Sequence, residues 1–189
     1  MKCERKKWRT KFVIYLISDT HFNHENIIKY CKRPFKNAEE MNDVLIKNWN
    51  SIVQNEDIVY HIGDFALGKK EDATNIAKKL NGVKYLIRGN HDKWSIKAYE
   101  EMGFSVLGGP FVRLDEYKIL LSHIPVQDIE VPEGYINVHG HIHNNNLYKC
   151  IGEYYDSKLY SLEKHINISC DMTDFKPISV IKVEQKNNY

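Results

Sequence analysis

The sequence has little of what marks secreted, membrane-spanning or repetitive proteins. Its 189 residues include only four cysteines, none of them in a Cys-x-x-Cys pair. We therefore expect reduced thiols in a cytoplasmic protein rather than a disulfide framework. No apolar run approaches the roughly 20 residues of a transmembrane helix, so we expect no membrane span. The chain also contains no internal repeat and no low-complexity segment.

Charge of one sign is also missing from most of the chain. The formal net charge is +2, but residues 1–11 hold six basic side chains and one acidic one, which leaves −3 for the remainder. No basic face large enough to require a nucleic-acid partner is visible. We predict a flexible basic N-terminus at 1–11, a single domain at 12–184 and a frayed C-terminus at 185–189.

Apolar runs and helical periodicity alternate in the first half of the chain. This order predicts right-handed crossovers and a parallel sheet. A polar loop is expected between the first strand and the first helix, and Asn37 with Glu40 forms a capping box for that helix. The predicted strands span 12–18, 57–62 and 83–87, and the predicted helices span 37–53, 70–80 and 94–102.

The second half is rich in predicted strands. A hairpin is expected over 111–121, followed by strands at 135–138, 166–169 and 178–183. Residues 144–165 are polar and rich in tyrosine, which predicts a surface excursion. Together the two halves predict an α/β fold in which two sheets pack against each other with helices outside.

Five short polar motifs follow these apolar runs. Taken singly, each has an ordinary explanation as a turn. Five of them at strand ends are harder to explain in this way, because the carboxyl ends of strands are where open α/β sheets build their sites. The motifs are Asp19-Thr20-His21, Gly63-Asp64, Gly89-Asn90-His91-Asp92, Ser122-His123 and Gly140-His141-Ile142-His143.

The residue types in these motifs suit divalent metal ions. Asp19 and His21 are two residues apart, as are His141 and His143. An extended backbone would place both side chains of each pair on the same side. Carboxylates, imidazoles and the Asn90 amide, without a thiolate, disfavour purely soft metals and leave Mn²⁺, Fe²⁺, Ni²⁺ and Zn²⁺ open, and we take Mn²⁺ as the preferred ion. Two such ions sharing a carboxylate hydrolyse phosphate esters.

Four further side chains are candidates for roles beside the metals. His91 is expected to point into the cleft and to give a proton to a leaving oxygen, and Asp92 to affect its orientation. His24 and Arg33, in the loop after the first motif, are expected to face the substrate.

In this order the motifs resemble the calcineurin-like metallophosphoesterase superfamily, whose pattern is Asp-x-His, Gly-Asp, Gly-Asn-His-Asp/Glu, His and Gly-His-x-His. The resemblance implies a four-layer αββα sandwich of two mixed β-sheets flanked by helices, and a metal-dependent phosphoric ester hydrolase. It also implies two divalent ions bridged by Asp64, with His91 as the acid or transition-state contact. The implied ligands are Asp19, His21, Asp64 and His143 for the first ion, and Asp64, Asn90, His123 and His141 for the second.

Residues outside the motifs narrow the resemblance to a small bacterial and phage group of predicted phosphoesterases without a large cap domain. They are Arg33-Pro34-Phe35, Asn167, Asp171 and Asp174-Phe175-Lys176-Pro177. An open cleft favours a phosphodiester of a small or nucleotide-type substrate, hydrolysed by in-line attack of a metal-bridging hydroxide. The alternatives are a phosphomonoesterase of the same mechanism, a metal-depleted interaction scaffold and a nuclease. No oligomeric state is predicted.

Overall fold

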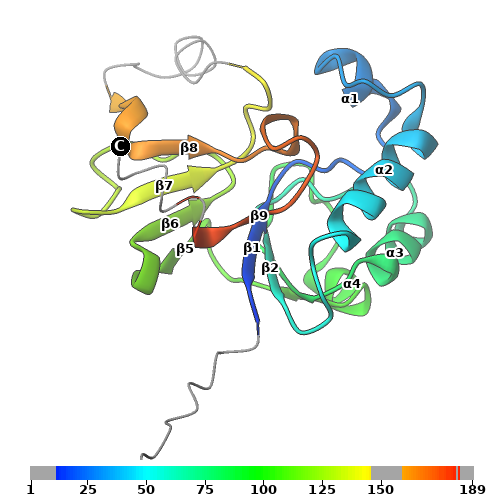
Figure 1. Cartoon of the computed structure of the whole chain (residues 1–189), viewed down its shortest axis with the longest axis horizontal. Helices are drawn as coiled ribbons and strands as arrows, with labels where there is room; N and C mark the ends of the chain where they lie inside the picture. Colours follow the sequence, from blue (N-terminus) through cyan, green and yellow to red (C-terminus); the bar gives the residue numbers. More distant parts are fainter. Residues whose placement is uncertain (1–11, 146–158, 182, 184–189) are drawn as a thin grey trace, which may run out of the picture.

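A computed structural model describes residues 12–145, 159–181 and 183. Two β-sheets lie face to face, and α-helices of the described residues cover the outer face of the first sheet (Figure 1). The predicted flexible ends and residues 146–158 of the predicted excursion lie outside the described residues. Among those described, no helix is both long and apolar enough to cross a bilayer.

The first sheet is mixed, in the order β4-β3-β2-β1-β9. Its first four strands run parallel, as the alternating pattern predicts, while β9 pairs antiparallel with β1. The strands are β1 (Ile14–Ile17), β2 (Ile58–His61), β3 (Val83–Leu86), β4 (Phe104–Val106) and β9 (Ile178–Ser179). The helices are α1 (Glu25–Tyr30), α2 (Ala38–Asn50), α3 (Lys70–Lys79) and α4 (Ile96–Glu101).

The second sheet is also mixed, in the order β5-β6-β7-β8. An antiparallel hairpin of β5 and β6 is followed by parallel β7 and β8. The strands are β5 (Phe111–Leu114), β6 (Ile119–Ser122), β7 (Ile136–His139) and β8 (His165–Asn167), with 3-10 helices η1 (Asp115–Tyr117), η3 (Leu162–Lys164) and η4 (Cys170–Met172). The predicted pair of mixed sheets with flanking helices is thereby confirmed.

The alternation of side chains along β1 explains why the sheets and helices form two cores. Leu16 packs between the two sheets, whereas its neighbour Ile17 packs between the first sheet and the helices. Successive residues of a strand face opposite sides, so a continuous apolar run serves both cores. α2 buries Met41, Leu45 and Trp49, which follow one another at intervals of four residues, in the core between the first sheet and the helices.

The predicted capping box at the start of α2 is present in part. The Asn37 side chain accepts a hydrogen bond from the Glu40 N–H. The Glu40 side chain accepts one in return from the Lys36 N–H, whereas a capping box would use the N–H of Asn37. A bonded cap satisfies N–H groups that have no partner inside the helix.

Three elements differ from the sequence prediction. Part of the expected polar loop forms α1, a helix of six residues that is too short to show helical periodicity. The three-residue β4 was not predicted. The predicted strand 178–183 is strand only as far as Ser179, and the chain is helical at Val180.

Candidate metal centre

The predicted polar motifs leave both sheets at the same end of the molecule. Asp19 follows β1, Asp64 follows β2 and Asn90 follows β3, while His123 follows β6 and His141 follows β7. The backbone ties these segments together. The segments after β1 and β2 are joined by N–H···O bonds from Asp19 to Gly63 and from His21 to Asp64, both 3.0 Å. A 3.0 Å bond from the Gly140 N–H to the His123 carbonyl joins the segments after β6 and β7.

The backbone at these motifs is left-handed, which corrects the expectation of extended pairs. The φ angles are 58° at Asp19, 48° at His21, 58° at Asp64, 71° at His141 and 51° at His143. A non-glycine residue in this region costs on the order of 1–3 kcal/mol and persists only where the surrounding structure imposes it. Five such residues in one region indicate that contacts elsewhere in the fold offset this strain and fix the orientation of their side chains.

Three glycines leave space for the motifs to approach one another. A Cβ atom at Gly63 would lie 2.6 Å from the Gly89 nitrogen and 2.6 Å from His123 Nδ1. A Cβ atom at Gly89 would collide with the Asp64 carboxylate, and one at Gly140 with the Asp19 carboxylate. Glycine at these positions is therefore required by close approach.

A first group of donor atoms comes from Asp19, His21 and His143, whose ligand atoms lie within 4.8 Å of one another. His21 is only 1% exposed, and neither of its ring nitrogens has a hydrogen-bond partner. Burial lowers the pKa of His21 to about 2, so the imidazole is neutral and has free lone-pair capacity. Buried polar groups are nearly always bonded, and a neutral imidazole beside carboxylates is a good ligand for a divalent cation.

A second donor group comes from Asp19, Asp64 and His123, again within 4.8 Å. Asp64 Oδ2 lies 3.5 Å from His21 Nε2 and 3.4 Å from His123 Nε2, between residues of the two groups. Burial alone would raise the pKa of Asp64, but hydrogen bonding and charge from His123, followed by His21, outweigh it and lower that pKa. The carboxylate therefore remains ionised.

Asn90 and His141 border the second group. Asn90 Oδ1 lies 2.9 Å from His123 Nε2, and the ring centroids of His123 and His141 are 5.1 Å apart. The two histidines of the last motif therefore diverge, because His143 joins the first donor group while His141 lies beside His123. The residues present fit two adjacent divalent ions.

Arg33 binds residues next to the first donor group, and its guanidinium is buried. Its guanidinium donates to both carboxylate oxygens of Asp171 at 2.8 and 2.9 Å, and to the carbonyls of Asp19 and Thr20. Arg33 is only 5% exposed, so these contacts give no support to the expected substrate contact. A guanidinium with this many protein acceptors is committed to buried ion pairing.

Asp171 is a residue that sequence reasoning noted only as a mark of the phage group. Its Oδ2 lies 3.0 Å from His143 Nδ1. Burial alone would lower the pKa of His143, but the hydrogen bond to Asp171, followed by Cys31 and the charge of Asp19, outweighs it and raises that pKa to about 10. The Cys31 thiol lies within 4.8 Å of a donor atom of His143 and of Asp171, so a thiol that was not predicted borders the site.

Asp92 is a positioning residue rather than a partner of the His91 ring. Its carboxylate accepts from the backbone N–H groups of Asp64, Phe65 and Gly89 and from the Tyr99 hydroxyl, at 2.7–3.1 Å. Four donors fill the acceptor sites of a carboxylate. Burial raises the pKa of Asp92, partly offset by these N–H groups. These bonds hold the backbone of Asp64 in place, and the expected effect of Asp92 on the orientation of His91 stays a prediction.

His91 and His24 lie at the rim of the site. The His91 N–H donates to Asp64 Oδ1 at 2.8 Å, while its side chain is exposed. The ring centroid of His21 lies 5.5 Å from that of His91 and 5.4 Å from that of His24. Both imidazoles can therefore meet a molecule that enters beside the donor groups.

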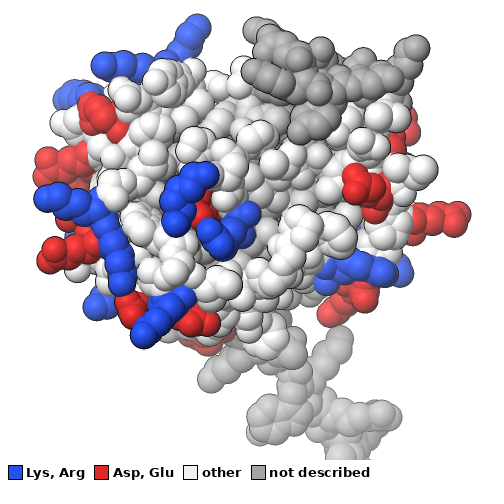
Figure 2. Space-filling model, turned by 180° about the vertical axis from the view of Figure 1, so that it is seen from behind, with Lys and Arg blue, Asp and Glu red and all other residues white. Residues whose placement is uncertain are grey.

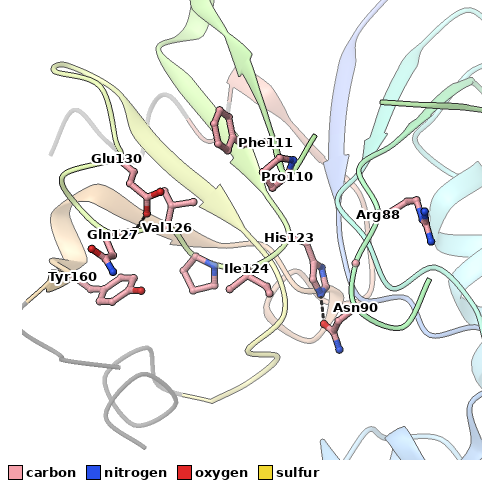
Figure 3. Close-up of a pocket in the computed structure, with 12 residues that line it drawn as sticks. Arg88, Asn90, Pro110, Phe111, His123, Ile124, Val126, Gln127, Glu130 and Tyr160 are labelled. Atoms are coloured by element: carbon pink, nitrogen blue, oxygen red, sulfur yellow. Dashed lines mark hydrogen bonds between the residues drawn. The ribbon is translucent and has the colours of Figure 1, made fainter. Parts of the chain in front are cut away.

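A cavity of about 480 Å³ opens beside Asn90 and His123 (Figure 3). Its walls come from the segment after β3, the start of β5 and the loop after β6. The candidate metal centre is thus continuous with a space of the size that small molecules occupy.

Comparisons with known proteins show what the chain as a whole is similar to. The model of the family described as calcineurin-like phosphoesterase matches residues 12–176. An uncharacterized protein of Methanocaldococcus jannaschii is 44% identical over 179 residues, covering 92% of each chain. The Gene 66 protein of Mycobacterium phage L5 is 26% identical over 160 residues, covering 69% of this chain and 77% of that protein. The crystal structure of a protein of unknown function from Aquifex aeolicus superposes with a TM-score of 0.67 at 30% identity, covering 92% of this chain and 98% of that chain.

Proposed function

Because this chain belongs to the calcineurin-like phosphoesterase family, we propose that it hydrolyses a phosphodiester of a small or nucleotide-type substrate at a centre of two divalent ions. Family membership makes the protein a metal-dependent phosphoric ester hydrolase, and its donor groups fit divalent ions. The number of ions, the diester preference and the residue roles below are our proposals.

The proposed first ion is held by Asp19, His21, Asp64 and His143, and the proposed second by Asp64, Asn90, His123 and His141. The position of Asp64 Oδ2, 3.5 Å from His21 Nε2 and 3.4 Å from His123 Nε2, is the observation that carries this assignment. An oxygen between two sets of ligands is where a bridging carboxylate belongs. When bound, two such ions lower the pKa of water and stabilise charge on phosphoryl oxygens. We keep manganese as the preferred metal, since the donors are oxygen and imidazole nitrogen.

The remaining proposed roles belong to side chains that contact the substrate or hold the ligands. His91, exposed at the rim, donates a proton or a hydrogen bond to the leaving oxygen. His24 contacts the substrate near His21, since the rings of the two histidines are neighbours. Asp92 fixes Asp64, and Arg33 with Asp171 fixes His143.

One face of the molecule carries mixed charge rather than a continuous basic groove (Figure 2). On the face shown in Figure 2, Lys and Arg side chains are intermixed with Asp and Glu. A protein that tracks a polyanion needs a continuous basic groove. The cytoplasmic location stays a prediction; Cys31 and Cys170, which are free and buried, accord with it.

The test combines a metal count with two substrates. Protein purified without chelator is analysed by elemental mass spectrometry, then assayed with Mn²⁺ on bis(p-nitrophenyl) phosphate and p-nitrophenyl phosphate. We expect two ions per chain and faster hydrolysis of the diester. A large preference for the monoester contradicts the diester assignment and supports the monoesterase, whereas no metal and no activity with added Mn²⁺ supports a scaffold.

Removing the proposed bridge tests the assignment of Asp64. Asp64→Ala should lose the paired ions and abolish hydrolysis, because Asp64 Oδ2 is the carboxylate oxygen that lies 3.5 Å from His21 Nε2 and 3.4 Å from His123 Nε2. Asp43→Ala, which removes an exposed carboxylate from α2, should behave like the wild type. Two ions per chain in Asp64→Ala would show that Asp64 does not bridge them.

A further inference from the structure

The cavity beside Asn90 and His123 is built unevenly along its length. Near the donor groups it is lined by Arg88, Asn90 and His123, and at the other end by Gln127 and Glu130 (Figure 3). The wall between these ends is largely apolar, formed by Pro110, Phe111, Ile124, Pro125, Val126 and Tyr160. A ligand that fills it therefore meets the proposed metal ligands Asn90 and His123 at one end and the side chains of Gln127 and Glu130 at the other.

Two of the apolar side chains in this cavity remain open to solvent. Phe111 is 47% exposed and Ile124 is 42% exposed. Phe111 is the first residue of β5, and Ile124 lies in the loop after β6. Apolar surface gathered in a concave site and rimmed by polar groups is typical of ligand binding. Phe111 offers a flat face on which a ring can stack.

The groups at the far end of the cavity restrict what the ligand can be. Glu130 Oε2 accepts a hydrogen bond from the Gln127 N–H at 3.0 Å, which holds that carboxylate at the cavity wall. A carboxylate there accepts hydrogen bonds from ring N–H or amino groups and repels a second phosphate. A polynucleotide or polyphosphate continuing in this direction is therefore disfavoured.

We infer that this cavity binds the nucleobase of a nucleotide ester whose phosphate lies at the metal centre. The ring stacks against Phe111, between Pro110 on one side and Ile124 on the other, with its polar edge toward Gln127 and Glu130. This inference rests on the proposed function for the phosphate, but the binding of the base depends only on the cavity. The two can therefore be tested separately.

Nucleosides test the cavity without the phosphate. Full-length protein is titrated with adenosine, guanosine, cytidine and uridine, with D-ribose as a control, and amide shifts are followed by NMR with and without EDTA. We expect shifts at Phe111, Ile124 and Gln127 from at least one nucleoside and none from ribose. Shifts confined to other regions, or none up to the solubility limit, would overturn the inference.

Paired substitutions then test the stacking contact. Phe111→Ala should weaken nucleoside binding by about tenfold, within the range for loss of one base–aromatic contact. Ile129→Ala is the matched control, because Ile129 lies in the same loop as Gln127, is 88% exposed and does not line the cavity. Equal effects of the two substitutions would refute a specific base site.

A kinetic comparison connects the cavity to the reaction. Thymidine 5′-(p-nitrophenyl phosphate) and methyl p-nitrophenyl phosphate share a leaving group and differ only in the other ester group. We expect the thymidine ester to have at least about tenfold higher kcat/KM, and this ratio to fall in Phe111→Ala but not in Ile129→Ala. Equal values for the two esters would contradict the inference. If nucleosides bind but no phosphate ester is hydrolysed with any added metal, the proposed function fails while the cavity assignment holds.

Discussion

At the scale of single residues, some side chains of the site supply donor atoms or face the substrate, and others hold those side chains in place. Asp64 stands between the two groups, and its own backbone is held by Asp92. His91 contributes its N–H to the Asp64 carboxylate and leaves its imidazole exposed. The two kinds of residue should therefore fail differently when they are substituted.

Replacing His91 should affect turnover without removing metal. We expect His91→Ala to keep the metal content of the wild type, because only the backbone of residue 91 contacts Asp64. Loss of general-acid catalysis should lower kcat by about 10²–10⁴-fold. Elemental analysis and steady-state kinetics on one preparation check both statements, and loss of metal in this variant would mean that His91 is a ligand.

Replacing Asp171 should affect metal without touching the cleft. Asp171→Asn removes the charge that orients His143 and compensates Arg33, so metal affinity should fall by about 10–100-fold. Calorimetric metal titration measures this change. Asp174→Asn, an exposed carboxylate three residues further on, is the control and should titrate like the wild type. Wild-type affinity in Asp171→Asn would show that the Arg33–Asp171 pair serves the fold alone.

At the scale of elements, the site is the junction between the carboxyl ends of strands from two sheets. β1, β2 and β3 bring donors from the first sheet, while β6 and β7 bring them from the second. The strands themselves contribute apolar side chains to the cores, and the donors sit just beyond them. Strand order therefore decides which segments meet, and glycine decides how closely they approach.

A methyl group at one of these junctions should separate the donors. Gly89→Ala places a Cβ against the Asp64 carboxylate and should destabilise the protein by about 1–3 kcal/mol, as overpacking does, while weakening metal binding. Gly108→Ala is the control, since nothing lies within 4 Å of its added Cβ. Thermal unfolding with and without metal distinguishes them. A Gly89→Ala protein with wild-type stability and affinity would show that the junction is not tightly packed.

At the scale of the whole molecule, a neutral histidine inside the core links stability to pH. His61 is fully buried among Trp49, Phe65 and Phe104, with its Nε2 2.9 Å from the Thr20 hydroxyl. Burial lowers the pKa of His61 to about 3, against 6.5 for the unfolded chain. Below pH 6.5 the unfolded chain binds a proton that the folded protein does not, so this stabilisation is present above pH 6.5 and is lost as the pH falls toward 3.

The expected slope is measurable in metal-free protein. Between pH 6.5 and 5 this residue should lower the free energy of unfolding by about 2 kcal/mol. Urea unfolding in EDTA at pH 7 and pH 5, compared between the wild type and His61→Gln, isolates its share of the pH dependence. The same loss of stability in both proteins would show that His61 does not remain neutral in the fold.

Much of this architecture was predictable because the signals are local. The apolar run around Leu16 and Ile17, the Asn37 cap and the stripe from Met41 to Trp49 each need only neighbouring residues to be recognised. α1 escaped prediction because six residues give no period, and β4 because three residues give no pattern. The pairing of Arg33 with Asp171 was not predicted, because the two residues lie 138 positions apart.

The order and types of polar residues were enough to establish a metal-binding chemistry and the family, since carboxylate, amide and imidazole donors at strand ends carry that information in the chain itself. Folding alone settled which donors share a group. His141 binds the Asp19 carboxylate through its backbone N–H, 122 positions away, while His143 turns to the other group. The left-handed φ angles at the donors and the close approach at Gly89 and Gly140 also arise only there. Such contacts depend on how two sheets pack, and no short stretch of sequence encodes that packing.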